Sequence, residues 1–246
     1  MLKEVHLVGP GCKLKAFSHQ NIDMSAPVAL IITQESQNQS IVQATINTLI
    51  ENGFSVIFFD FERVDNIIKN EVEKREVLLT EIVYVIDFIM KERFYSSSFW
   101  LISFGNIIWE SLQAIIRRPE ITDFVLFNPT QKNNKDISFL IPCSLTGMIV
   151  YNDTKKEQTT LIKNIINRIT TKDNGQIKEI FFDDDINSKQ SVQRLAKTLD
   201  DYVKSRVELT AGEIKRVRRD KRRRKKKIVK EEITDKQYKA IRPLSV

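Results

Sequence analysis

The chain has 246 residues, of which 41% are hydrophobic, so it can close one large α/β domain or two small ones, and disorder throughout is excluded. The formal net charge of +7 is unevenly distributed. Residues 204–246 carry 17 basic and 6 acidic side chains, a net charge of +11, whereas residues 1–203 carry 22 and 26, a net charge of −4. Such asymmetry predicts a polyanionic partner for the basic end.

The cysteines and the first residues give no sign of a secreted or membrane protein. Cys12 and Cys143 are too few for a disulfide framework and have no metal-ligand spacing, so we expect two small buried side chains in a reducing compartment. No apolar run approaches the roughly 18 residues of a membrane span. Residues 1–10 lack the features of a secretory signal or an arginine-rich presequence.

Strand and helix patterns alternate along the chain. Gly9-Pro10-Gly11 indicates an N-terminal hairpin, residues 27–33 are an apolar run typical of a buried strand, and residues 40–52 predict a helix that ends at Gly53. The other expected strands are 54–61, 98–103, 123–127, 145–151 and 177–182, and the other expected helices are 73–93, 106–117, 158–171 and 188 to about 208.

This alternation predicts an α/β fold, with a mostly parallel, doubly wound sheet in a three-layer α/β/α sandwich. The composition changes once, near residues 210–212, where a helix is expected to end. We therefore expect a domain over residues 1–209 and a basic C-terminal extension over residues 210–246.

Ser103 lies between an expected strand and an expected helix, in the sequence Leu101-Ile102-Ser103-Phe104-Gly105. This is a partial match to the GxSxG nucleophile elbow, with leucine at the first glycine. The chain continues with RRPEI at 117–121 and GMIVYND at 147–153. In this order and spacing, residues 5–203 resemble a family of small bacterial α/β-hydrolases that carry GFSFG at the elbow, RRPEI after its helix and an HGDxD-like motif later. The resemblance implies the α/β-hydrolase fold.

The same resemblance exposes departures from a catalytic triad. Acyl transfer in this fold needs Ser, Asp and His in that order, but the two histidines, His6 and His19, precede Ser103 by more than 80 residues. Where the family's GADH motif supplies the base, this chain has residues 183–186, DDDI, and where the family has its second aspartate, this chain has Lys155.

The loop expected to form the oxyanion hole is altered too, because residues 33–40 read TQESQNQS and contain no glycine. We therefore interpret Ser103 as a vestigial elbow and predict no catalytic residue. The three aspartates at 183–185 could suggest a divalent metal site, but a solvated acidic turn is the better interpretation, and His6 and His19 have no partner at metal-ligand spacing. No metal and no cofactor are predicted.

Residues 215–230 form a dense basic run, with 12 basic residues and one acidic residue in 16. Such a run favours phosphate contacts with nucleic acid, since each neutralised phosphate releases counterions. It lacks the interleaved apolar residues of an interfacial helix, so no membrane partner is predicted. The candidate RNA-binding residues are Lys215, Arg216, Arg218, Arg219, Lys221, Arg222, Arg223, Arg224, Lys225, Lys226, Lys227 and Lys230.

Together these patterns lead to the hypothesis of a non-catalytic structural component of a ribonucleoprotein. Its basic tail would bind RNA, first of all rRNA, and its body would contact neighbouring proteins of a mitochondrial ribosome, with the bacterial cytoplasm as the alternative location. Two alternatives stay open: a serine hydrolase or esterase that uses Ser103 on a small acyl substrate, and a free nucleic-acid-binding or chaperone-like protein.

Overall fold

The computed structural model describes most of the first 207 residues of the chain. The described ranges are 3–8, 13–23, 25–33, 39–60, 71–92, 98–129, 146–152, 156–169, 177–182 and 188–207. The chain divides into two compact units, Met1–Asp200 and Asp201–Val246, and the architecture below is that of the first. The boundary expected between residues 209 and 210 lies outside the described residues and stays a prediction.

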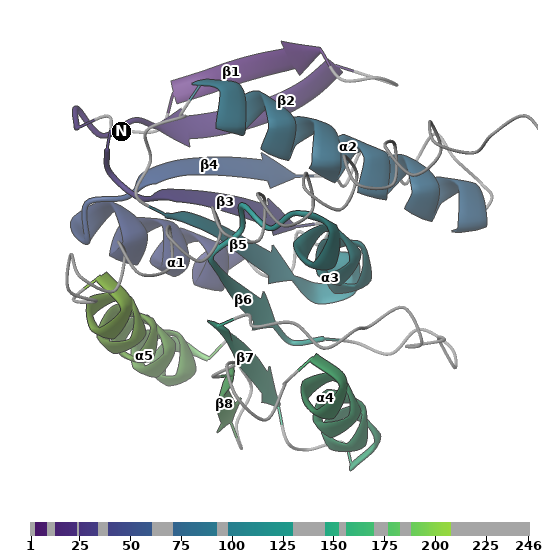
Figure 1. Ribbon diagram of the computed structural model, residues 1–246. Helices are drawn as coiled ribbons and strands as arrows, with labels where there is room; N and C mark the ends of the chain where they lie inside the picture. Colours follow the sequence, from purple (N-terminus) through teal and green to yellow (C-terminus); the bar gives the residue numbers. More distant parts are fainter. Residues whose placement is uncertain are drawn as a thin grey trace, which may run out of the picture. The chain divides into compact units, whose positions relative to one another are not determined.

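The first unit is built on one eight-stranded sheet (Figure 1). In sheet order the strands are β1 (Lys3–Val8), β2 (Lys13–His19), β4 (Ser55–Asp60), β3 (Val28–Thr33), β5 (Phe99–Phe104), β6 (Asp123–Phe127), β7 (Thr146–Asn152) and β8 (Ile177–Phe182). The β1–β2 hairpin is antiparallel and β2 runs antiparallel to β4, whereas every pair from β4 to β8 is parallel. The predicted mostly parallel sheet is confirmed.

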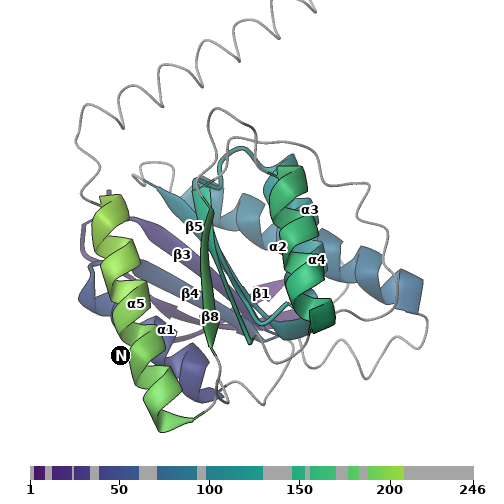
Figure 2. The same ribbon diagram turned by 90° about the horizontal axis from the view of Figure 1, so that it is seen from below.

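Helices cover both faces of this sheet, as Figures 1 and 2 show. They are α1 (Gln39–Glu51), α2 (Glu71–Glu92), α3 (Ile108–Arg117), α4 (Lys156–Ile169) and α5 (Lys189–Val207). α1 and the part of α5 up to Asp200 lie on one face, and α2, α3 and α4 lie on the other. The predicted three-layer α/β/α sandwich is confirmed. Within the described ranges, no helix has the length and apolarity needed to cross a membrane.

The burial of the central strands explains why their sequences are apolar throughout. All six residues of β3 and of β5 are buried, since helices cover both faces and strands flank both edges. α2 turns Leu78, Ile82 and Ile89 toward the core at helical spacing, as its sequence predicts. α1 ends at Glu51, and the turn that follows contains Gly53, whose φ of +80° is the left-handed conformation that favours glycine. The carbonyl of Gly53 accepts a 2.7 Å hydrogen bond from Asn21 Nδ2.

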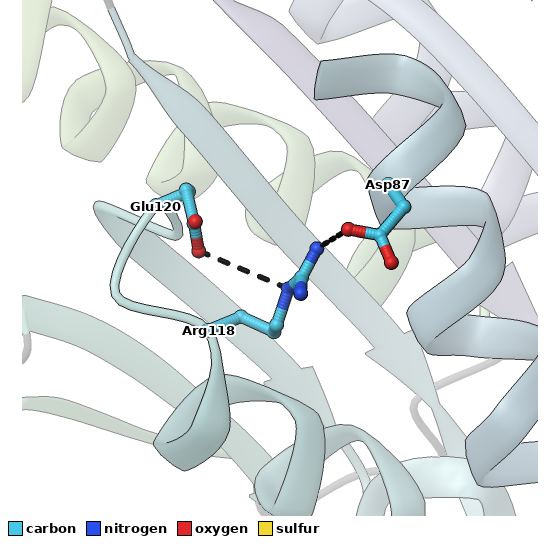
Figure 3. A network of polar contacts seen from close by, with 3 residues as sticks. All are labelled: Asp87, Arg118 and Glu120. Atoms are coloured by element: carbon cyan, nitrogen blue, oxygen red, sulfur yellow. Dashed lines mark hydrogen bonds and ion pairs between the residues drawn. The ribbon is translucent and has the colours of Figure 1, made fainter. Parts of the chain in front are cut away.

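An ion-pair network joins α2 to the turn that follows α3 (Figure 3). The guanidinium of Arg118 lies between two carboxylates: its Nη2 donates to Asp87 Oδ1 on α2, and its Nε lies 3.8 Å from Glu120 Oε2. The side chains of Asp87 and Glu120 are 48% and 39% exposed, so we expect each ion pair to contribute little to stability. The network links α2 to the connection between α3 and β6.

Candidate active site

The order of the strands identifies the part of the sheet where a ligand would bind. After β3 the chain passes through α1 to β4 on one side of β3, and then through α2 to β5 on the other side. α1 and α2 lie on opposite faces of the sheet (Figures 1 and 2). In doubly wound sheets, ligands bind outside the carboxyl ends of the strands at such a reversal. The candidate site therefore lies where β3 ends at Thr33 and β5 ends at Phe104.

The connection from β5 to α3 is a sharp strand–turn–helix. Phe104 is still extended, with φ −120° and ψ 135°, and Gly105 then takes a φ of +68° and begins the 3-10 turn η3 (Gly105–Ile107), which leads directly into α3. A left-handed residue is needed to turn the chain from the strand into the helix, and glycine adopts it without steric cost. The turn is therefore centred on Gly105. The sequence analysis expected it at Ser103, two residues earlier.

Ser103 belongs to β5 itself rather than to the turn. It pairs with Ile32 of β3 on one side and with Leu126 of β6 on the other, and its exposed fraction is 0%. Its Oγ donates to Ser111 Oγ on α3 at 2.7 Å, and Ser111 Oγ donates to the carbonyl oxygen of Ile107 at 2.8 Å. Both hydroxyl groups therefore donate hydrogen bonds within the protein, and the Ser103–Ser111 bond links α3 to β5.

The end of the neighbouring strand β6 has a second left-handed residue. Asn128 has a φ of +52°, and its backbone N–H donates to the carbonyl oxygen of Val150 at 2.7 Å. The residues just before the two left-handed positions, Phe104 and Phe127, stack with ring centroids 4.4 Å apart and planes 6° apart. Sequence reasoning missed Asn128 as part of the site, although an asparagine before a proline at the end of a strand is a turn signal. We call Thr33, Gly105 and Asn128 the carboxyl-edge site.

The structure does not bring the two histidines to this site. His19 is the last residue of β2, where it pairs with Val56 near the start of β4, so it lies toward the opposite edge of the sheet. His6 lies on β1, the outermost strand. The candidate acid and base segments, residues 153–155 and 183–186, lie outside the described residues, as does the loop at 34–38.

The basic run at 215–230 also lies outside the described residues, so contact with RNA through its twelve lysines and arginines, and contact with neighbouring proteins, stays a prediction. Cys12, Cys143 and the hairpin turn at 9–11 lie outside them too. In the described part of the chain, no group of three or more His, Cys, Asp or Glu side chains could hold a metal ion.

Comparison with known proteins shows which solved structures have a similar fold. No protein-family model matches the chain. An uncharacterized protein of Rickettsia prowazekii (strain Madrid E) is 21% identical over 213 residues, which cover 82% of this chain and 89% of the relative. A solved structure from Agrobacterium tumefaciens, of a protein of unknown function assigned to the α/β-hydrolases, is 23% identical, has a TM-score of 0.66 and covers 83% of this chain and 96% of that one. The dienelactone hydrolase of Anabaena variabilis is 11% identical, with a TM-score of 0.66 and coverages of 82% and 95%.

This chain has the α/β-hydrolase fold. The resemblance found in the sequence is confirmed at the level of fold. In that fold the residue at the turn after the central strand is the one exposed at the top of the sheet. Here the residue at the turn is Gly105, which is itself buried, and Ser103 is the buried residue two positions before it.

The comparisons contradict the functional hypothesis drawn from the sequence. The solved structures that share the α/β-hydrolase fold over four-fifths of this chain are named as hydrolases, so the prediction of a non-catalytic ribosomal component is wrong, and so is the prediction that the chain is not an enzyme. The sequence reasoning gave too much weight to a basic tail and to absent triad residues. The relative and the neighbours are bacterial, so the mitochondrial location is not supported.

The Ser103–Ser111 pair gives a testable prediction about stability. Ser111→Ala leaves the buried Ser103 hydroxyl without its acceptor, so we expect a loss of about 2 kcal/mol in the free energy of unfolding. Ser103→Ala removes a donor but leaves Ser111 bonded to Ile107, so it should cost about 1 kcal/mol. Urea denaturation of both single variants and of the double variant measures these losses in the free energy of unfolding. Equal costs for the two single variants, or a double variant that shows their full sum, would contradict the pairing.

Proposed function

We propose that this chain is a hydrolase that cleaves a small acyl compound, an ester first of all, at the carboxyl-edge site. The observation that carries the proposal is the β5–η3–α3 turn with left-handed Gly105, placed where the strand order reverses. The dienelactone hydrolase with the same fold supports an ester substrate, since a lactone is a cyclic ester. The bacterial relative and neighbours support the bacterial cytoplasm as the location.

In this proposal the start of η3 provides the donors for an acyl carbonyl. Neither η3 nor α3 has a side-chain hydrogen bond at its N-terminal cap, Phe104 or Ile107. The first N–H groups of a helix have no partner within the helix, and they suit an oxygen that gains negative charge as its carbonyl is attacked. In this proposal the acyl carbon lies at the carboxyl-edge site, with its oxygen directed to the first N–H groups of η3.

Hydrolysis of p-nitrophenyl acetate and butyrate by the purified full chain tests the proposal, with two variants at one position. Gly105→Ala and Gly105→Leu both place a side chain at a left-handed backbone position, and leucine adds more bulk than alanine beside the carboxyl end of β5. We expect turnover by the parent chain and a kcat/KM for Gly105→Leu that is lower than that of Gly105→Ala by about tenfold or more, equivalent to about 1.4 kcal/mol of lost transition-state binding.

Circular dichroism and thermal unfolding of both variants show that the comparison is between folded proteins. A contaminating esterase would give the same rate in both preparations. The absence of turnover in the parent chain, or equal rates in the two folded variants, would disprove the proposed function.

A further inference from the structure

The charges of this chain are divided between its two compact units. Residues 1–200 carry 22 basic and 25 acidic side chains, whereas residues 201–246 carry 17 and 7, so the net charges are −3 and +10. The described part of the second unit already has this character, since Lys204 is exposed and Arg206 is partly exposed in the last turn of α5. The second unit therefore suits a densely anionic partner, and the first does not.

Most of the positive charge of the second unit lies in residues 215–230, which we call the basic segment. It contains six arginines, six lysines and one acidic residue, Asp220. Like charges this close together repel one another, and a partner with closely spaced negative charges relieves the repulsion. Duplex DNA carries one negative charge per about 1.7 Å of helix axis, and each phosphate that a lysine or arginine neutralises releases condensed counterions.

The absence of aromatic residues from this part of the sequence favours a duplex over a single strand. Proteins that bind single strands without sequence preference stack the bases on aromatic side chains. Residues 203–237 contain no Phe, Trp, Tyr or His, and Tyr202, which precedes them, is only 5% exposed. A bilayer surface is disfavoured for a related reason, since the apolar residues of the basic segment are only Val217, Ile228 and Val229.

We propose that the basic segment binds duplex DNA through the phosphate backbone, without selecting a base sequence. This binding goes beyond the proposed hydrolase function and does not rest on it. Contacts from lysine and arginine to phosphate position a protein on the duplex but carry no sequence information. Residues 1–200 have a net negative charge and are repelled by the phosphates, so the affinity comes from the basic segment.

Fluorescence anisotropy of a labelled DNA duplex of about 20 base pairs, titrated with the purified full chain, tests the proposal. If about 6 to 10 phosphates are contacted, Kd should rise by about a thousandfold or more between about 50 and 200 mM KCl. A second duplex of the same length and unrelated sequence should give the same Kd within about twofold at each salt concentration.

Two variants with the same change in charge separate the basic segment from the α/β domain. The combined substitution Arg222→Gln, Arg223→Gln and Arg224→Gln removes three charges from the segment. Each lost phosphate contact lowers the slope of log Kd against log salt by about 1, so we expect a slope lower by about 2 to 3. The control variant replaces three exposed lysines of α4 and α5 and should keep the parent slope: Lys163→Gln, Lys189→Gln and Lys197→Gln.

Absence of binding to the duplex at about 50 mM KCl, a Kd that does not change with salt, or an equal loss of slope in the two variants would overturn the proposal. Binding that is as tight or tighter to a single-stranded DNA or RNA of the same length, or to phosphatidylglycerol vesicles, would also overturn it. Hydrolysis of p-nitrophenyl acetate by the same preparations is a separate measurement. A chain that binds the duplex but hydrolyses no ester disproves the proposed function alone.

Discussion

Gly147→Ala is expected to destabilise the protein by about 2 to 3 kcal/mol, although it adds one methyl group. Gly147 lies on β7 opposite Phe124 of β6, and the Phe124 ring lies over it. A β-carbon built on Gly147 would come closer than 3.0 Å to three atoms of that ring. Phe124 is fully buried, so the ring has no free space to move into. Thermal or urea unfolding of the single variant measures the cost.

A double-mutant cycle shows whether the ring causes this cost. In the background of Phe124→Leu the flat ring over Gly147 is gone, so Gly147→Ala should cost less there than in the parent chain by at least about 1 kcal/mol. If the two substitutions are instead additive, the clash with Phe124 is not the reason for the glycine. Strain elsewhere in β7 would then have to explain the cost of Gly147→Ala.

Trp100→Ala is expected to have the largest effect of any substitution considered, about 4 kcal/mol. Trp100 lies on the central strand β5, is 1% exposed, and meets Phe54 edge to face with ring centroids 5.2 Å apart and planes 79° apart. Its removal leaves a cavity between the sheet and the segment that follows α1. The fluorescence of Trp109, the other tryptophan, follows unfolding in this variant.

Trp100→Phe is the matched control, because it keeps an aromatic ring against Phe54 and leaves a smaller cavity. We expect it to lose less than half as much stability as Trp100→Ala. A loss of the same size in both variants would mean that the indole is needed for more than its volume, and a loss under about 1 kcal/mol in Trp100→Ala would contradict the packing described for this strand.

The sequence predicted the core of the fold closely. The strands at Asp123–Phe127 and Ile177–Phe182 agree with the expected ranges, and β3, β4, β5 and β7 differ from theirs by one residue at one or both ends. For β1 and β2 only a hairpin turn was expected, without strand ranges. This accuracy has a physical cause, since strands covered on both faces must be apolar at every position, and helices over a sheet must repeat their apolar residues at helical spacing. These patterns depend on local sequence alone.

The candidate site was predicted less well, because its geometry depends on single backbone angles. The sequence reasoning centred the turn on Ser103 by analogy with GxSxG, whereas the backbone turns at Gly105. The glycine was a usable signal, since it is the residue best suited to a positive φ. The approach of Phe124 to Gly147 could not be foreseen, because it depends on the register between β6 and β7. The functional hypothesis favoured RNA because it relied on the basic tail. The composition of that tail gives no information about the chemistry of the α/β domain.

The strand order also has a consequence for the chain as it leaves the ribosome. From β5 to β8, each new strand pairs with the strand made just before it, so the sheet grows outward in the direction of synthesis. Each intermediate exposes one apolar edge until the next strand covers it. Growth ends at β8, whose exposed Lys178 and Glu179 make it a poor template for a further strand. On the other side of the sheet the N-terminal hairpin adds β1 and β2 beside β4, so the edge strand there comes from the first part of the chain to be made.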